Sequence, residues 1–205
     1  MRKIFSILLL SGAALSYAQV SFAAKTNLLF PTGSPTWKNI KSTVVDSYES
    51  KGKNNVGFNI GVSAQVSLPM SWFVMPELYY TTFTNEFTDP LTNTTLKAKS
   101  NRIDLPVLVG KSFLGNLLGV YVGPVASYNL SKDNQWSDFK EHATKDFTVG
   151  YQFGAQAKIK KLIINARYEG AFSKDTREFV NNNITETVKY DNRPSLFMLG
   201  LGYQF

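Results

Sequence analysis

The chain of 205 residues contains no cysteine and a single histidine, His142. Without cysteine it can form neither a disulfide framework nor a thiolate metal site. Apolar runs are also scarce. Beyond the N-terminal segment, no stretch approaches the ~20 residues that a membrane-spanning helix needs. These absences exclude a disulfide-stapled module and a helical membrane protein, and they predict neither a metal nor a cofactor.

The N-terminal segment has the composition of a secretory signal peptide. Residues 2–3 are basic, residues 4–15 are apolar, and Ser16-Tyr17-Ala18 offers small residues for cleavage. The sequence therefore predicts a signal peptide over residues 1–18 and one mature domain over residues 19–205. An uncleaved anchor is the alternative, but the apolar run is shorter than a spanning helix requires.

The formal charge of +7 is not arranged as a nucleic-acid surface. Cleavage after Ala18 removes two of the positive charges. Lys111, Lys158, Lys160 and Lys161 are dispersed over expected strands and turns. Basic residues scattered in this way are usually solvated, so we expect no nucleic-acid partner.

The C-terminal segment, residues 193–205, carries a large apolar residue at every second position and ends on an aromatic one. These residues are Phe197, Leu199, Leu201, Tyr203 and Phe205. Successive side chains of a strand point to opposite faces, so this segment presents one apolar face. The residues between them are mostly small or polar. This pattern is typical of a lipid-facing strand of a transmembrane β-barrel.

The same alternation recurs along the chain, most clearly in residues 56–68 and 147–159. Both segments exceed the ~9–11 residues that a tilted strand needs to cross a membrane. Their polar faces are mostly Gly, Ser, Asn, Gln and Thr, which suits a crowded lumen better than the open surface of a soluble barrel, the alternative. Further strands are expected at residues 20–29, 71–83, 100–110, 118–130 and 162–172.

The connections between these strands alternate in length. Short ones lie near residues 69–70, 111–116 and 160–161, and long polar ones, expected to be loops, cover residues 30–55, 84–99, 131–145 and 173–192. Outer-membrane barrels have short periplasmic turns and long extracellular loops. The sequence predicts an all-β fold, an eight-stranded antiparallel up-and-down transmembrane β-barrel, in the outer membrane of a Gram-negative bacterium.

Several short motifs carry a resemblance to a known family. They are Pro76-Glu77-Leu78, Ile103-Asp104-Leu105-Pro106, Gly123-Pro124, Arg167-Tyr168-Glu169 and the terminal Gly202-Tyr203-Gln204-Phe205. In order and spacing the chain resembles the PorT-type outer-membrane barrels of the Bacteroidota, within the broad class of OmpX-like barrels. The resemblance implies location and fold. It also implies that the barrel-assembly machinery recognises the C-terminal aromatic strand.

Charged residues on the inward faces form the first candidate site: Lys25, Glu77, Arg102, Asp104, Lys158, Arg167 and Glu169. The lumen of an eight-stranded barrel is just wide enough for side chains to fill it. Buried charges must be paired. We therefore expect a structural network of salt bridges that fills the lumen; a narrow ion or water path is the alternative.

His142 is the second candidate, because some eight-stranded outer-membrane lipid A deacylases use His, Ser and Glu near the outer rim. In those enzymes the His and Ser are two residues apart on a strand. Here the matching position is Thr144, and the segment is expected to be a loop. No catalytic triad can be assembled from these residues, so we expect no enzymatic activity; a lipid-modifying enzyme is the least favoured alternative.

The first long connection combines aromatic and basic residues: Trp37, Tyr48, Lys38, Lys41, Lys51 and Lys53. Aromatic rings beside cations can bind sugars or phosphates. The sequence thus predicts a monomeric barrel with a structural or surface-interaction role, in contact with outer-membrane lipids and lipopolysaccharide. An adhesin-like or lipopolysaccharide-binding module is the alternative.

Overall fold

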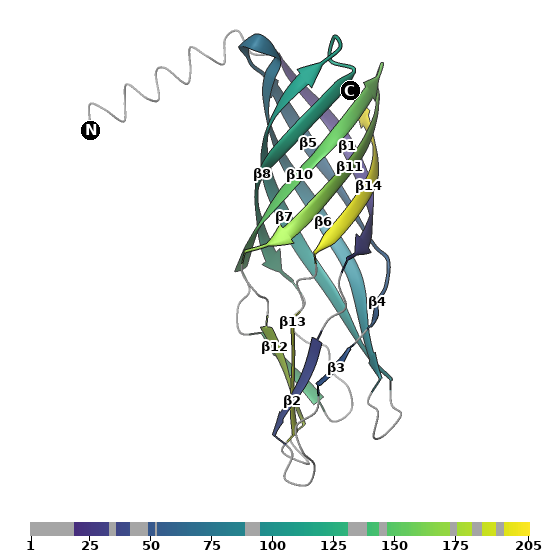
Figure 1. Cartoon of the computed structure of the whole chain (residues 1–205), viewed down its shortest axis with the longest axis vertical. Coiled ribbons are helices and arrows are strands. Elements are labelled where there is room, and N and C mark those ends of the chain that lie inside the picture. Colours follow the sequence, from purple (N-terminus) through teal and green to yellow (C-terminus); the bar gives the residue numbers. More distant parts are fainter. Residues whose placement is uncertain are drawn as a thin grey trace, which may run out of the picture.

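The computed structural model describes residues 19–32, 36–41, 49–51, 53–88, 95–130, 139–143, 147–172, 176–181, 186–191 and 195–205. Eight long strands of this structure form a barrel (Figure 1). In chain order they are β1 (Val20–Pro31), β5 (Gly57–Ser67), β6 (Trp72–Thr88), β7 (Thr95–Phe113), β8 (Leu118–Asn129), β10 (Phe147–Ile159), β11 (Leu162–Ala171) and β14 (Leu196–Gln204).

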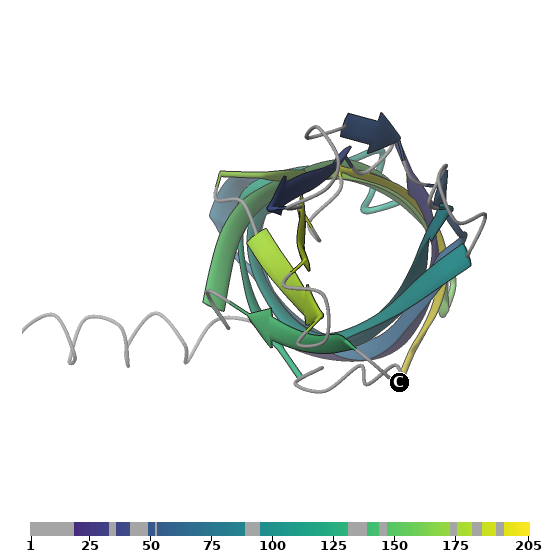
Figure 2. The ribbon, with the colours of Figure 1, turned by 90° about the horizontal axis from the view of Figure 1, so that it is seen from below.

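Each barrel strand pairs antiparallel with its neighbour in chain order, and the pairing of β1 with β14 closes the ring. Figure 2 shows this ring along the barrel. A closed barrel leaves no edge strand within its wall, so every wall strand has a partner on both sides. The predicted fold, an eight-stranded antiparallel up-and-down barrel, is confirmed.

Burial alternates along the strands as the sequence pattern predicts. On β5, Phe58, Ile60 and Val62 are 50–58% exposed, whereas Asn59 and Ser63 on the opposite face are 4% exposed. An apolar exterior around a polar interior is the reverse of a soluble protein, and it is the arrangement that a bilayer stabilises.

The strand boundaries agree closely with the sequence pattern for β10, which spans the expected residues 147–159. The largest differences are in β6 and β7, which have 17 and 19 residues and run well past the expected 71–83 and 100–110. Both extend on the side of the long connections (Figure 1), where β4 (Lys53–Asn54) also pairs with β6.

A second sheet lies beyond the barrel on the same side (Figure 1). It has five strands in the order β3 (Glu49–Lys51), β2 (Thr36–Lys41), β13 (Glu186–Asp191), β12 (Thr176–Asn181) and β9 (Phe139–Ala143). The expectation that the long connections are loops was wrong for these segments, including the segment of His142, which lies in β9. The reason is that each strand is short and two of the four pairings join strands of different connections, so local periodicity does not reveal the pairing.

The turns at the opposite end are tight. A single 3-10 turn, η1 (Pro69–Ser71), joins β5 to β6. Lys160 and Lys161 join β10 to β11. No helix among the described residues combines the length and the apolar character needed to cross a membrane.

Candidate functional site

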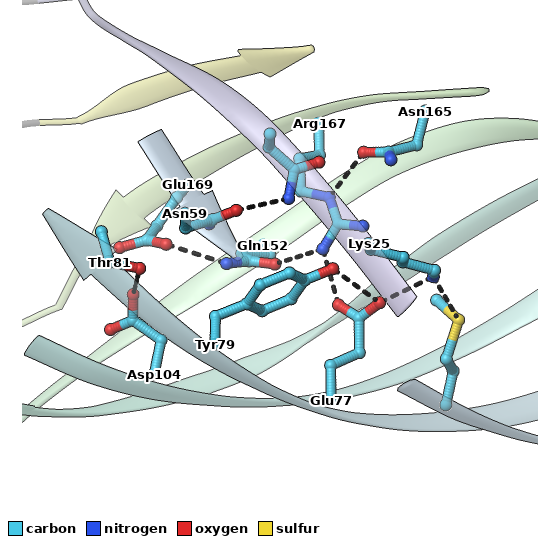
Figure 3. A network of polar contacts seen from close by, with 12 residues as sticks. Lys25, Asn59, Glu77, Tyr79, Thr81, Asp104, Gln152, Asn165, Arg167 and Glu169 are labelled. Atoms are coloured by element: carbon cyan, nitrogen blue, oxygen red, sulfur yellow. Dashed lines mark hydrogen bonds and ion pairs between the residues drawn. The ribbon is translucent and has the colours of Figure 1, made fainter. Parts of the chain in front are cut away.

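The lumen of the barrel contains six of the seven charged residues predicted to point inward. Each is 1–3% exposed; they are Lys25 on β1, Glu77 on β6, Arg102 and Asp104 on β7, and Arg167 and Glu169 on β11. The period-two alternation of each strand places them on the inner face, opposite the lipid-facing residues. The geometry of these six residues defines the site, which we call the lumenal network. Figure 3 shows five of them, all but Arg102.

Glu77 is the centre of one half of the network. Its Oε1 atom lies 2.8 Å from Lys25 Nζ, and its Oε2 atom lies 2.6 Å from Arg167 Nη1. Tyr79 donates its hydroxyl hydrogen bond to the same carboxylate at 3.3 Å. Lys25 Nζ also contacts Met75 Sδ at 3.2 Å. One carboxylate thus pairs with two buried cations from two other strands.

Arg102 is the centre of the other half. Its Nη2 atom donates to Glu169 Oε1 at 2.7 Å, and its Nε atom donates to Asp104 Oδ2 at 3.0 Å. Thr81 donates its hydroxyl hydrogen bond to Asp104 at 2.6 Å. The guanidinium carbon of Arg102 also lies 5.6 Å from the centroid of the Phe83 ring.

Gln152 of β10 connects the two halves. Its Oε1 atom accepts a hydrogen bond from Arg167 Nη1 at 3.4 Å, and its Nε2 atom donates to Glu169 Oε2 at 2.8 Å. Figure 3 shows the contacts from Lys25 to Glu169. Arg102 then joins Glu169 to Asp104, so the network continues without interruption to Thr81. Its three cations and three carboxylates balance in charge.

The Arg167 side chain is packed on several sides. Its guanidinium carbon lies 5.6 Å from the ring centroid of Tyr79 and 5.4 Å from that of Tyr121. Its Nε atom donates to Asn165 Oδ1 at 3.0 Å. Stacking on aromatic rings and forked hydrogen bonding are the interactions that favour arginine over lysine at a buried position.

Glycines on neighbouring strands make room for these large side chains. A Cβ atom added at Gly154 would lie 2.7 Å from Arg167 Cβ, and one added at Gly202 would lie 2.8 Å from Lys25 Cγ. Real Cβ atoms do not approach other atoms so closely. The glycines on the inward faces thus leave the space that the large side chains of the adjacent strands occupy.

Apolar clusters lie on either side of the charges. Phe73, Met75, Leu108 and Tyr121 pack together toward the end with the short turns. Leu29, Leu196 and Met198 pack together where β1 ends and β14 begins, toward the second sheet. The lumen is therefore filled by side chains along its length, as expected for an eight-stranded barrel.

The structure does not bring every predicted residue into the network. Lys158 is half-buried near the short turns and forms no ion pair among the described residues. The residues of the C-terminal strand face outward, with 40–71% exposure; these are Phe197, Leu199, Leu201, Tyr203 and Phe205. Conversely, sequence reasoning did not single out Gln152, Tyr79 or Asn165, although each lies on an inward face of its strand.

The network can hold charges in fixed positions, but its geometry does not suit metal binding. Within the part of the chain that the structure describes, no group of three or more His, Cys, Asp or Glu residues is arranged to hold a metal ion. Each carboxylate is already paired with a cation at 2.6–2.9 Å. Displacing any member of the network would leave its buried partner unpaired.

The barrel with a charged, filled interior and an apolar exterior defines the class of the protein: an integral outer-membrane β-barrel protein of the small, eight-stranded type. A family model described as the outer membrane protein beta-barrel domain matches residues 15–176. The chain belongs to this family, and its location is the outer membrane.

Two solved structures show the same fold at low sequence identity. The crystal structure of the outer membrane protein OprG from Pseudomonas aeruginosa is 16% identical, with a TM-score of 0.65; the match covers 91% of this chain and 95% of OprG. The solid-state NMR structure of the outer membrane protein AlkL is 10% identical, with a TM-score of 0.55, and covers 92% of each chain. A search of curated proteins gave no match.

Proposed function

We propose that the protein is a closed outer-membrane barrel whose role, structural or interactive, is carried by its extracellular part, and that it does not conduct solutes through its lumen. The single observation that supports this proposal is the charge-balanced lumenal network, which crosses the barrel from Lys25 to Thr81 without a break. An ion passing through would have to separate buried pairs, and each separation leaves a charge without a partner.

Planar-bilayer recording tests this proposal directly. The purified full-length protein should insert and show no steady conductance, because the lumen is filled by paired charges and by two apolar clusters. Addition of the same detergent without protein is the control. A reproducible steady conductance of the wild-type barrel would refute the closed lumen and support the narrow ion path.

A specific observation favours surface binding as the form of the interactive role. The register of the second sheet pairs Trp37 of β2 with Tyr190 of β13, and Tyr190 in turn with Arg177 of β12. An aromatic pair followed by a cation in one cross-strand row is suited to sugars and phosphates. We therefore propose carbohydrate, including that of lipopolysaccharide, as the ligand class of this row.

Binding of purified lipopolysaccharide to the protein in nanodiscs tests this second proposal. The double variant Trp37→Ala, Tyr190→Ala should lose binding, whereas Val188→Ala, a smaller change on the same sheet, should retain it. Unchanged affinity of the double variant, or no measurable binding by the wild type, would count against the surface-binding role and leave the structural one.

We also propose that the protein is not an enzyme. One observation speaks for the alternative: the register places His142 of β9 opposite Glu178 of β12. Thr144, at the position that corresponds to the serine of the lipid A deacylases, lies outside the described residues. Mass spectrometry of lipid A from cells with and without the protein decides the matter, and a protein-dependent loss of an acyl chain would overturn this part of the proposal.

The same proposal has four further parts. We propose that the chain is related to the PorT-type barrels of the Bacteroidota, that residues 1–18 are cleaved, that the barrel-assembly machinery inserts the protein, and that it is a monomer. The kinship is supported by motif residues that carry lumenal charges: Glu77, Asp104, Arg167 and Glu169. Chemical crosslinking of intact cells would test the monomeric state, and a crosslinked dimer would refute it.

A further inference from the structure

The end of the barrel that carries the short turns contains lysines and no acidic residue. We define this turn-end rim as residues 19–22, 68–73, 110–119, 158–162 and 202–205, all of which the structure describes. Its charged side chains are Lys111, Lys158, Lys160 and Lys161. Elsewhere along the barrel wall, Glu77, Asp104 and Glu169 are turned into the lumen and paired. The charged side chains of the rim are therefore all positive.

Two of these lysines are held against aromatic rings on the outer surface. Lys111 Nζ lies 5.5 Å from the centroid of the Trp72 ring, and the two residues are cross-strand partners of β7 and β6. Lys161 Nζ lies 5.6 Å from the centroid of the Tyr203 ring. Trp72 and Tyr203 are 44% and 52% exposed on the lipid-facing side. A cation stacked on an outward-facing ring marks the polar boundary of a bilayer.

Large apolar side chains project from the same rim. Met70, Leu114 and Phe205 are among the most exposed hydrophobic residues of the described chain. They would be unfavourable in water, and the hydrocarbon edge of a bilayer would cover them. A rim that carries both lysines and apolar groups is suited to a bilayer surface, where negatively charged headgroups lie directly above the hydrocarbon.

The backbone at Lys160 gives an independent indication. Its φ of 57° lies in the left-handed region that favours glycine, asparagine or aspartate in a two-residue hairpin turn. A lysine here is a conformationally poor choice, and residues kept in such positions are often there for their function. Met70, Ser71, Leu114 and Asn116 of the rim share this backbone region without a charge, so the turn geometry does not by itself select lysine at position 160.

From these observations we propose that the turn-end rim binds the phosphate groups of anionic phospholipids, with Lys111, Lys160 and Lys161 as the principal contacts. The ligand is a lipid that combines a negative headgroup with acyl chains, such as phosphatidylglycerol. The lysines contact the phosphate, and the apolar residues beside them contact the chains. Selective lipid binding at this rim goes beyond the proposed role of the extracellular part.

Quenching of Trp72 fluorescence by brominated lipids tests the proposal. A background in which Trp37 and Trp136 are replaced by phenylalanine leaves Trp72 as the sole tryptophan, beside Lys111. In liposomes of the full-length protein, brominated phosphatidylglycerol should quench at about a fivefold lower mole fraction than brominated phosphatidylcholine, which corresponds to the attraction of one lysine to an anionic surface. High salt should reduce the difference, because it screens exposed charges.

The triple variant Lys111→Gln, Lys160→Gln, Lys161→Gln should bring the two quenching curves together. The matched control Lys53→Gln, Lys97→Gln, Lys99→Gln removes the same charge at the opposite end and should keep the preference. The single variant Lys111→Gln, which removes the charge beside the Trp72 ring, should fold normally and weaken the preference. Equal quenching by both lipids in the wild type, or an unchanged preference in the rim variant, would overturn the proposal.

Discussion

Arg167 Nη1 lies 2.6 Å from Glu77 Oε2, although 90 residues separate the two in the chain. The same carboxylate accepts a hydrogen bond from Lys25 Nζ at 2.8 Å, so one residue pairs with two cations that are each 2% exposed. Strands β1, β6 and β11 must all be in register for these three side chains to meet. The pair therefore links the closure of the barrel to the charge balance of its lumen.

Replacing Glu77 by glutamine should destabilise the barrel by about 3–5 kcal/mol, the usual result of leaving a buried charge without its partner. Lys25 and Arg167 would both lose their carboxylate. Urea unfolding of the protein in lipid vesicles measures the loss. The matched control is Glu86→Gln, which removes a carboxylate from the extension of β6, where it accepts a hydrogen bond from Asn55 at 3.0 Å. Equal stability of Glu77→Gln and the wild type would contradict a structural role of the network.

Replacing Gly200 by alanine should also destabilise the barrel, for a steric reason. The added Cβ atom would lie 1.8 Å from Asn27 Oδ1 and 2.6 Å from Asn165 Nδ2 on the two neighbouring strands. Overpacking of this kind costs about 1–3 kcal/mol. Gly119→Ala is the control, because its Cβ atom would meet its nearest neighbours at an ordinary 3.5 Å. The same unfolding experiment compares the two variants, and similar midpoints would argue against close packing at Gly200.

The sequence was sufficient to predict the barrel because each spanning strand carries its own signal. Alternation in β5 and β10 identifies the two faces of the wall without knowledge of any other strand. The inward charges could be named for the same reason. Their pairing could not, because Glu77 meets Arg167 through the strand tilt and register of the closed barrel, and local sequence does not specify these.

The second sheet was missed for a related reason. Its strands have three to six residues, too few for a clear periodicity, and β13 pairs with β2 from a connection near the other end of the chain. Gln152 was missed differently: an uncharged residue on a polar face gives no sign that it will connect two ion pairs. Residues 1–18, the expected signal peptide, lie outside the described residues.

The lipid-facing surface gives a prediction that depends on depth. Arginine at Val62, which is 54% exposed in the middle of β5, should cost about 2–4 kcal/mol, whereas arginine at Ile159, 54% exposed beside the Lys160 turn, should cost about 0–1 kcal/mol. Arginine carries the same charge at both sites, and only the distance from the bilayer surface differs. Unfolding in lipid vesicles measures both variants. A soluble barrel would tolerate the two substitutions equally, so equal effects would contradict the membrane assignment of this face.

Phe205 gives a prediction about assembly rather than stability. Its backbone N–H donates to Phe22 O at 3.0 Å, its ring lies edge-on to that of Tyr203 at 6.2 Å, and its side chain is 71% exposed. An exposed side chain at the end of the closing strand contributes little to packing, so Phe205→Ala should refold in detergent with a midpoint close to that of the wild type.

In cells the same variant should accumulate unfolded, because the assembly machinery for similar barrels recognises the C-terminal aromatic residue. Heat-modifiable migration on gels measures the folded fraction in both settings, with Phe197→Ala, at the other end of β14, as the control. Normal migration of the Phe205 variant from cells would refute recognition of this residue, and a failure to refold in detergent would show that its role is in the fold itself.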